Sequence, residues 1–212
     1  NPVPIQIPVG EEEHHVGVVD LVEMKSIVYH DDLGQDFTVG EIPAELVEAA
    51  REHHHALIDA IAEFDDELME TYLDDEAAVT PAMLRRALRA GTLADAITPV
   101  VLGSAIKNKG VQPLLDAVVD YLPSPLDIPP THGDNPDTGA DETRTASDDQ
   151  PFTALAFKIM TDPYVGSLTF LRVYSGVLAS GSYAFNSIKG RRERIGRLLK
   201  MHANKREEIK EA

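Results

Sequence analysis

The stretch Ile97-Thr-Pro-Val-Val-Leu-Gly-Ser-Ala-Ile-Lys-Asn-Lys-Gly-Val-Gln-Pro-Leu-Leu115 decides how this chain folds. Its first part is apolar and rich in β-branched residues until Gly103, which is typical of a buried strand in a parallel sheet. After the polar residues 107–110, apolar side chains recur at helical spacing until Pro123 ends the pattern. The stretch therefore predicts a strand, a loop and a helix.

Ser104 and Ala105 follow the predicted strand. In open α/β sheets, ligands bind at the loops that leave the carboxyl ends of the strands. A plain strand-to-helix turn would contain the same residues, so this dipeptide alone leaves both interpretations open.

Composition limits the class of protein. The chain has 212 residues, of which 43% are hydrophobic, which is enough for one large or two small domains with a packed core. It has no Cys, which excludes disulfides and thiolate zinc sites and is compatible with a reducing cytoplasm. We find neither a signal-peptide pattern nor an apolar run of about 18 residues, and therefore expect neither secretion nor a membrane span.

The net charge of −17 is unevenly distributed. Residues 148–212 hold 11 Lys and Arg against 7 Asp and Glu, whereas the rest of the chain holds 8 against 29. The acidic part would be repelled by nucleic acid, and the basic part could meet phosphates. The charge pattern thus predicts two domains with different partners.

The residues before Ile97 predict a small antiparallel β unit followed by helices. Pro4 and Pro8 place the first strand at an edge, because proline cannot donate to a strand ladder. Expected strands cover residues 3–9, 16–22, 26–29 and 37–39, with a turn at 31–34. The expected helices run from Pro43 through an apolar stripe with a break near Asp65, and from a cap at Thr80 to a stop at Gly91.

Residues after the last predicted helix change character. A stretch rich in Pro, Gly, Asp and Thr predicts a linker or mobile loop over 128–150. Short β-rich segments separated by glycines then predict a β-barrel, with strands at 152–160, 167–175, 182–186 and 194–202. We therefore expect three parts: an α/β domain over 1–127 with an α+β insertion at about 10–95, the linker, and the first strands of a barrel over 151–212.

Motifs for catalysis and metal binding are missing. The phosphate loop Gly-x-x-x-x-Gly-Lys-Ser/Thr does not occur, so Asp31-Asp-Leu-Gly34, which matches Asp-x-x-Gly, predicts a turn. His53, His54 and His55 are consecutive, and on a helix they point about 100° apart, so they cannot converge on one ion. We expect His53 to be half-buried. The sequence predicts no catalytic residue and no metal site.

Glu45, Glu48 and Glu52 share one face of a predicted helix, at positions i, i+3 and i+7. Like charges at this spacing repel one another, and a basic partner would relieve that cost. The face is therefore either solvated or a contact for a basic protein.

A basic run lies within the predicted β region. It is either the polar exterior of a barrel or a contact for RNA phosphates, which needs charge and no base reading. On an extended strand, Arg192 and Arg194 would share one side with Lys200. The run consists of Arg191, Arg192, Arg194 and Arg197.

Several stretches resemble bacterial elongation factor G, a family of translational GTPases. The longest begins with Gly-Ser-Ala-Ile-Lys-Asn-Lys-Gly-Val-Gln (103–112) and continues to Pro130, and the family usually has Phe where Ile106 stands here. Together the stretches cover essentially the whole chain. The others are Val-Val-Asp-Leu-Val-Glu-Met-Lys (18–25), Phe-Lys-Ile-Met-Thr-Asp-Pro-Tyr-Val-Gly (157–166), Arg-Val-Tyr-Ser-Gly-Val-Leu (172–178) and Met-His-Ala-Asn-Lys-Arg-Glu-Glu-Ile (201–209).

The resemblance implies roles for the residues singled out above. Ser104 and Ala105 match the fifth guanine-nucleotide motif, which supports the guanine ring of GTP or GDP. The helix carrying Glu45, Glu48 and Glu52 would contact the lysine-rich ribosomal stalk protein. The fold would be the end of a P-loop GTPase domain with its α+β insertion, followed by part of an all-β translation-factor barrel.

The resemblance also implies an activity for the parent protein. The parent would hydrolyse GTP, with Mg²⁺ on the phosphates, to drive tRNA–mRNA translocation on cytoplasmic ribosomes, without membrane or DNA partners. The phosphate and magnesium motifs fall outside these 212 residues. We therefore expect this chain alone to bind no cofactor and to be inactive. The alternatives are a sister translational GTPase, such as a ribosome-protection protein, and a ribosome-binding module that uses no nucleotide.

Overall fold

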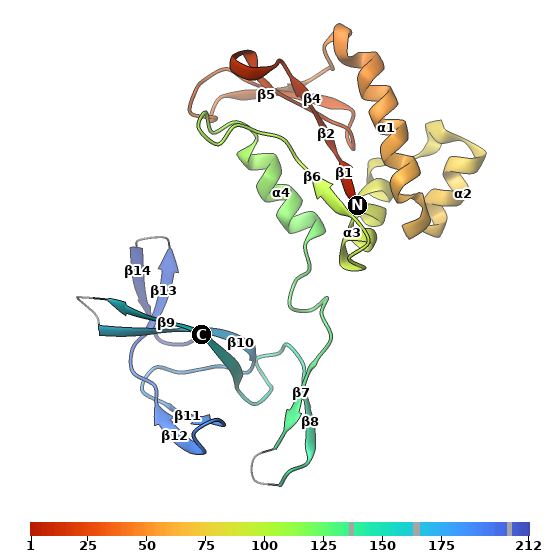
Figure 1. Cartoon of the computed structure of the whole chain (residues 1–212). Coiled ribbons are helices and arrows are strands. Elements are labelled where there is room, and N and C mark those ends of the chain that lie inside the picture. The colour runs from red at the N-terminus through yellow and green to blue at the C-terminus, as the bar shows by residue number, and fades with distance from the viewer. Residues whose placement is uncertain (136–137, 163–165, 203–204) are drawn as a thin grey trace. The chain divides into compact units, whose positions relative to one another are not determined.

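The computed structural model describes residues 1–135, 138–162, 166–202 and 205–212. Two stretches that carry the resemblance, 157–166 and 201–209, each include residues outside this description. The chain forms two compact units, Asn1–Pro123 and Ser124–Ala212. The first combines helices and strands and the second contains strands (Figure 1), so the expected fold class, mixed α/β followed by an all-β part, is confirmed.

The N-terminal residues build a four-stranded antiparallel sheet in the order β2-β3-β4-β5. As predicted, the strand with Pro8 lies at the edge of this sheet, opposite Val18. The prediction of one strand over 3–9 was wrong, because the chain changes sheets at Ile5, whose N–H donates to Val100 O and whose carbonyl accepts from Leu21. The strands are β2 (Gln6–Val9), β3 (Gly17–Asp20), β4 (Lys25–Tyr29) and β5 (Phe37–Gly40).

The residues before Ile5 form a separate strand, β1 (Pro2–Pro4), which pairs in parallel with β6 (Thr98–Val100). The prediction of a fully buried strand over 97–102 was too strong. Ile97 is buried, whereas Val100 to Leu102 are half-buried. The reason is that β1 is the one strand beside β6 among the described residues.

Helix boundaries follow local capping chemistry. The predicted break at Asp65 is confirmed: its carboxylate accepts from Leu68 N–H at 2.9 Å and begins a new helix. Thr80 caps the third helix, with Pro81 at its first position. The helices are α1 (Val47–Ile61), α2 (Asp66–Asp74), α3 (Pro81–Leu93) and α4 (Val111–Tyr121), and 3-10 turns cover Glu12–His14, Ala44–Leu46, Ala62–Phe64 and Glu76–Ala78.

Gly91 does not end α3, contrary to the prediction, because the helix continues to Leu93. The glycine is needed for packing instead. A Cβ at this position would lie 2.8 Å from Phe64 Cδ2 and 2.9 Å from Ile97 Cδ1. Gly91 therefore lets α3 approach the residue that leads into β6.

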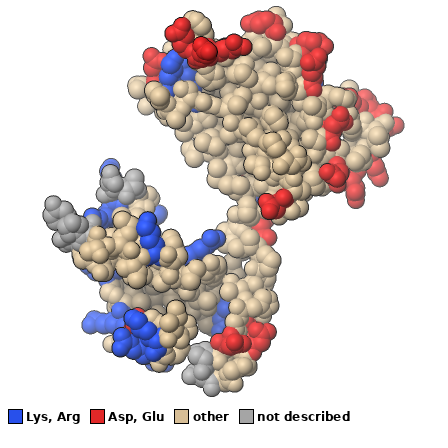
Figure 2. Space-filling view, in the orientation of Figure 1, with Lys and Arg blue, Asp and Glu red and all other residues tan. Residues whose placement is uncertain are grey.

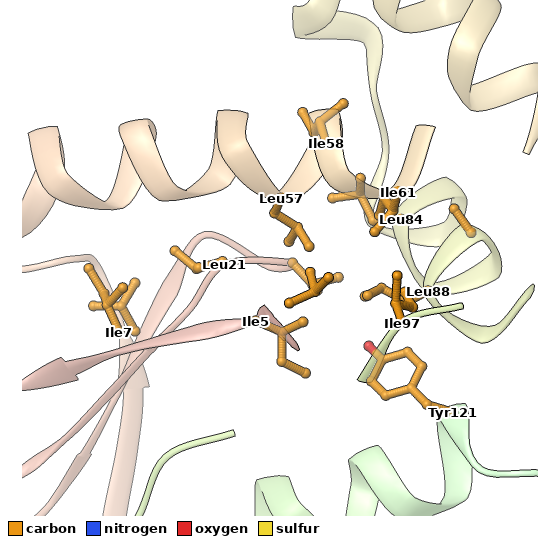
Figure 3. Packing of buried hydrophobic residues seen from close by; sticks show 14 of the residues in the cluster. Ile5, Ile7, Leu21, Leu57, Ile58, Ile61, Leu84, Leu88, Ile97 and Tyr121 are labelled. Carbon is orange, nitrogen blue, oxygen red and sulfur yellow. The ribbon is translucent and has the colours of Figure 1, made fainter. Parts of the chain in front are cut away.

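One aliphatic cluster forms the core of the first unit. Figure 3 shows Leu57 and Ile61 of α1, Leu84 and Leu88 of α3, and Ile97 gathered in this cluster. The predicted stripe of α1 was wrong at its centre, where His53 is exposed rather than half-buried. The buried residues of α1 are Ala50, Leu57, Ile58 and Ile61.

Helix α4 forms where the sequence predicted it, but its apolar side chains are mostly exposed. Tyr121 is buried against the core, whereas Leu115 and Val119 are 59% and 77% exposed. Elements in the described part of the first unit leave this face of α4 uncovered. The packing of α4 on the core is therefore determined by its C-terminal end, which carries Tyr121.

The second unit consists of antiparallel strand pairs. The segment 128–150, predicted as a linker, contains one of them, β7 (Thr131–Asp134) with β8 (Asp141–Arg144). The strand predicted over 194–202 was wrong, because residues 195–197 bend between two strands and Ile195 O accepts from Gly181 N–H. The other pairs are β9 (Thr153–Asp162) with β10 (Gly166–Ser175), β11 (Tyr183–Asn186) with β12 (Arg191–Arg194), and β13 (Leu198–His202) with β14 (Lys205–Ile209).

None of the helices in the described ranges combines the length and the apolar composition that crossing a lipid bilayer requires.

The packing at Gly91 generates a stability prediction. Gly91→Ala should destabilise the first unit by about 1–3 kcal/mol, because the added methyl group would displace the packed side chains of Phe64 and Ile97, at a cost above the roughly 1 kcal/mol that alanine gains over glycine in a helix. Gly40→Ala is the matched control, since a Cβ there has no neighbour within 4 Å. Urea denaturation followed by far-ultraviolet circular dichroism measures both. Equal stability of the two variants would contradict the packing described.

Candidate functional site

The Ser104 loop, residues 103–110, joins β6 to α4. Two backbone bonds close it: Ser104 N–H donates to Lys109 O at 2.9 Å, and Lys109 N–H donates to Ser104 O at 3.0 Å. Within the loop, Asn108 N–H donates to Ala105 O at 3.3 Å. The chain's own backbone therefore sets the shape of the loop before any ligand arrives.

Two glycines allow the ends of the Ser104 loop to meet. A Cβ on Gly103 would lie 2.6 Å from Lys109 O, and a Cβ on Gly110 would lie 2.5 Å from Leu102 O. Gly110 also has a φ of 81°, which side-chain-bearing residues rarely adopt. Larger residues at either end would open the loop.

Ser104 and Ala105 lie next to each other at the start of the loop, and Ala105 is exposed. Because the backbone of Ser104 is already paired with Lys109, the available backbone donor of this pair is Ala105 N–H, which no bond uses in the described part of the chain. The following Ile106 is 98% exposed. The loop can thus present one N–H and one hydroxyl to the edge of a flat ligand.

The two lysines of the loop contact backbone carbonyls. Lys107 Nζ donates to Glu13 O at 3.0 Å, and Lys109, which is 6% exposed, places its Nζ 3.5 Å from His15 O. Both ammonium groups thus lie beside backbone carbonyls in the connection between β2 and β3. As placed, they do not form a phosphate site.

On its other side the loop rests on the turn 31–34. Asn108 Nδ2 donates to Leu33 O at 2.7 Å, and Gln112 Nε2 donates to Gly34 O at 2.6 Å. Asp31 accepts backbone bonds from Gln35 and Asp36, so this segment is a turn, as predicted. The sequence did not predict that this turn contacts the Ser104 loop. Gly34 was the one residue in the turn that could have indicated a close contact.

Glu45, Glu48 and Glu52 are all exposed. Glu48 and Glu52 lie one turn apart on α1, and Glu45 belongs to the preceding 3-10 turn. Glu48 is in the first turn of α1, where a carboxylate is favourable to the helix dipole. The structure thus brings the three carboxylates to neighbouring positions at the beginning of one helix.

The histidines of α1 have different surroundings. His54 Nδ1 lies 2.6 Å from Leu21 O, and His55 Nδ1 lies 3.1 Å from a Glu76 carboxylate oxygen. The hydrogen bond that His55 donates to the Glu76 carboxylate raises the pKa of His55 above its ordinary value of 6.5. The nearby Tyr72 hydroxyl donates to Asp59 at 2.7 Å, which raises the pKa of Tyr72 to about 12. In the described ranges, no group of three or more His, Asp and Glu side chains could hold a metal ion.

The basic run lies at the β11–β12 hairpin. Glu193 is paired with Lys189 at 2.9 Å and Arg191 at 3.5 Å, and the hydrogen bond from Lys189 lowers the pKa of Glu193. Arg192 and Arg194 are exposed on β12. The expected shared side with Lys200 was wrong, because Lys200 lies on β13, beyond the bend at 195–197.

The charged residues divide between the two units. On the face drawn in Figure 2, acidic side chains dominate the first unit, whereas basic side chains gather on the second. Arg197, the last residue of the predicted run, is exposed in the bend after β12. The uneven charge predicted from the sequence is thus a surface property of each unit.

Comparisons with known proteins agree with the resemblance inferred from the sequence. Residues 151–212 match the family model for elongation factor G domain 2. The whole chain is also similar to a crystal structure of a protein from Thermus thermophilus, ttk003000868, with a TM-score of 0.75 and 28% sequence identity over 100% of this chain. This chain spans 28% of the length of that protein.

Residues 151–212 are thus similar to elongation factor G domain 2, and the resemblance to elongation factor G is confirmed.

The contact between His55 and Glu76 generates a pH prediction. Glu76→Gln should lower the pKa of His55 towards 6.5, as measured by nuclear magnetic resonance of the imidazole protons. Because the folded-state pKa is raised, the stabilisation from this contact is complete below 6.5 and is lost as the pH rises through the folded-state pKa. Asp59→Asn, which removes a weaker influence, should shift the pKa less. An unchanged His55 titration in Glu76→Gln would contradict the contact.

Proposed function

We propose that this chain is part of a translational GTPase of the elongation factor G type, in which it supports the guanine base and contacts the ribosome. The match of residues 151–212 to elongation factor G domain 2 carries the proposal. The longer protein would bind GTP or GDP with Mg²⁺ and couple GTP hydrolysis to the movement of tRNA and mRNA on cytoplasmic ribosomes. Among the described residues, no group of three or more His, Asp and Glu could hold Mg²⁺, and Lys107 and Lys109 contact backbone carbonyls, which supports a contribution of this chain to base binding rather than to hydrolysis.

In this proposal, Ser104 and Ala105 recognise guanine. The exposed Ala105 N–H would donate to the guanine carbonyl oxygen, and the Ser104 hydroxyl would support the ring edge. An adenine ring has an amino group in place of that oxygen and would leave the N–H without an acceptor. The contact would therefore favour guanine over adenine without involving a charged residue.

Two surfaces would contact the ribosome. The exposed carboxylates Glu45, Glu48 and Glu52 would attract the lysine-rich stalk protein and accelerate its association. The exposed Arg192, Arg194 and Arg197, with Arg191, would contact ribosomal RNA through its phosphates. The division of charge between the units supports one protein partner and one RNA partner.

Two alternatives use the same residues. A sister translational GTPase, such as a ribosome-protection protein, would share the guanine contact and the domain 2 fold. A ribosome-binding module that uses no nucleotide is favoured by one observation, the engagement of both loop lysines by backbone carbonyls. An upstream reading frame that encodes a phosphate loop would exclude the nucleotide-free module.

The guanine assignment predicts very weak binding by the chain alone. Two hydrogen bonds contribute about 1 kcal/mol each, whereas a millimolar complex needs about 4 kcal/mol. Titration calorimetry of these 212 residues should therefore detect no GDP binding at millimolar concentration. A protein extended upstream to include a phosphate loop should bind GDP and discriminate against ADP. Micromolar affinity in the 212-residue chain would contradict the proposed division of the site.

The acidic face predicts a salt-sensitive interaction. Changing Glu45, Glu48 and Glu52 to Lys should lower the association rate with the stalk protein at least tenfold at low salt, since attraction becomes repulsion. The control changes Glu63, Glu70 and Asp74, which are also exposed, to Lys and thus alters the net charge equally. Surface plasmon resonance at several salt concentrations measures both rates. Equal rates for the two triple variants would show that the face is merely solvated.

A further inference from the structure

The Ser104 loop is held by side chains that do not belong to the predicted guanine motif. Asn108 bonds to Leu33 O, 75 positions away in the sequence, and Gln112 bonds to Gly34 O, 78 positions away. We propose that Asn108 and Gln112 are positioning residues, which hold the loop on the turn 31–34 so that Ala105 N–H meets the guanine base. This inference rests on the proposed function.

The carboxamide of Gln112 is fixed from two sides. Its Nε2 donates to Gly34 O at 2.6 Å, and its Oε1 accepts from the Tyr29 hydroxyl at 3.1 Å. Tyr29 is 3% exposed and lies on β4, next to the turn. Burial raises the pKa of Tyr29, so its hydroxyl stays protonated and continues to donate at neutral pH. Gln112 therefore links the first turn of α4 to two points of the antiparallel sheet region.

Asn108 serves the loop through its backbone as well as its side chain. Its φ is 53°, in the left-handed region that Asn tolerates better than most residues. A Cβ on Gly34 would lie 1.9 Å from Asn108 O, so the turn and the loop approach at backbone distance. The contact thus needs Gly at position 34 and a residue that tolerates positive φ at position 108.

The opposite side of the loop is fastened independently. Lys107 and Lys109 donate to Glu13 O and His15 O, in the connection between β2 and β3. Between these two attachments, Ala105 and Ile106 remain exposed. The geometry therefore presents the base-contacting residues on a loop held from both flanks, and a pre-ordered loop does not lose its conformational freedom when a ligand binds.

Isosteric variants test the positioning role. Asn108→Asp keeps the size and the tolerance for positive φ but removes the donor to Leu33 O, and Gln112→Glu removes the donor to Gly34 O. Gln35→Glu is the matched control, because it adds the same charge beside the turn, at an exposed side chain. All three variants keep the glycines that close the loop.

The first measurement is amide hydrogen exchange in the 212-residue chain. In Asn108→Asp and Gln112→Glu, the Lys109 amide, which donates to Ser104 O, should exchange at least fivefold faster, while the amides of α1 stay unchanged. Gln35→Glu should match the parent. If the Lys109 amide keeps its protection in both variants, the proposed attachment to the turn is wrong.

The second measurement uses the longer protein that includes a phosphate loop. Its affinity for GDP is compared with that for 2-aminopurine riboside diphosphate, which lacks the guanine carbonyl oxygen. The ratio of the two affinities should fall about fivefold in Asn108→Asp and Gln112→Glu, which corresponds to about one hydrogen bond, because Ala105 N–H is misplaced. A general loss of stability would weaken both ligands equally and leave the ratio unchanged.

The outcomes separate the two proposals. If the parent protein binds GDP and the analogue equally, the guanine contact of the proposed function is wrong, and the positioning role is wrong with it. If the parent discriminates between them and the variants do so equally well, the guanine contact stands and the positioning role is overturned. A reduced ratio in both variants, with the parent ratio in Gln35→Glu, supports the inference.

Discussion

Burial of one aliphatic cluster between α1, α3 and the β1–β6 pair is the interaction on which the first unit depends. Ile58, Leu88 and Ile97 are each at most 4% exposed, and burying side chains of this size contributes about 1.5–3 kcal/mol each. Ile97 is also the residue that leads into β6. The core therefore sets where β6 begins and, a few residues later, where the Ser104 loop leaves it. Gly91 makes this arrangement possible because α3 needs close contact with Ile97.

The core places the loop, and polar contacts give it its shape. Side-chain donors from the loop and from α4 meet backbone carbonyls of two connections in the antiparallel unit, at Glu13 and His15 on one side and at Leu33 and Gly34 on the other. Carbonyls at the ends of turns lack partners in regular secondary structure, so these donors satisfy groups that would otherwise need water. The antiparallel sheet region thus supports the candidate base-binding residues, and the acidic face lies at helix α1, which follows it. A conformational change in either connection would therefore shift Ala105, because only a few hydrogen bonds and covalent bonds separate them.

Local chemistry explains which elements were predictable. The cap at Thr80 and the break at Asp65 depend on bonds three residues apart, so the residues involved are visible in the sequence. The strand, loop and helix around Ser104 follow from periodicity and from glycines in the same short stretch. The prediction failed where a distant neighbour decided the outcome. Strand β1 separates from β2 because Ile5 N–H donates to Val100 O. Glycine is required within α3 at position 91 because a side chain there would collide with Phe64 and Ile97.

The sequence by itself determined the fold class of the chain, the order of its α/β and β parts, its division of charge, and the position of Ser104 and Ala105 at the end of a strand. These properties depend on composition and on short-range patterns, which a linear chain displays directly. Only the tertiary structure decided that Asn108 and Gln112 hold that loop, and that both loop lysines are engaged by carbonyls. These contacts join residues more than 70 positions apart, and their partners are backbone carbonyls, which every residue carries and which therefore leave no mark in the sequence.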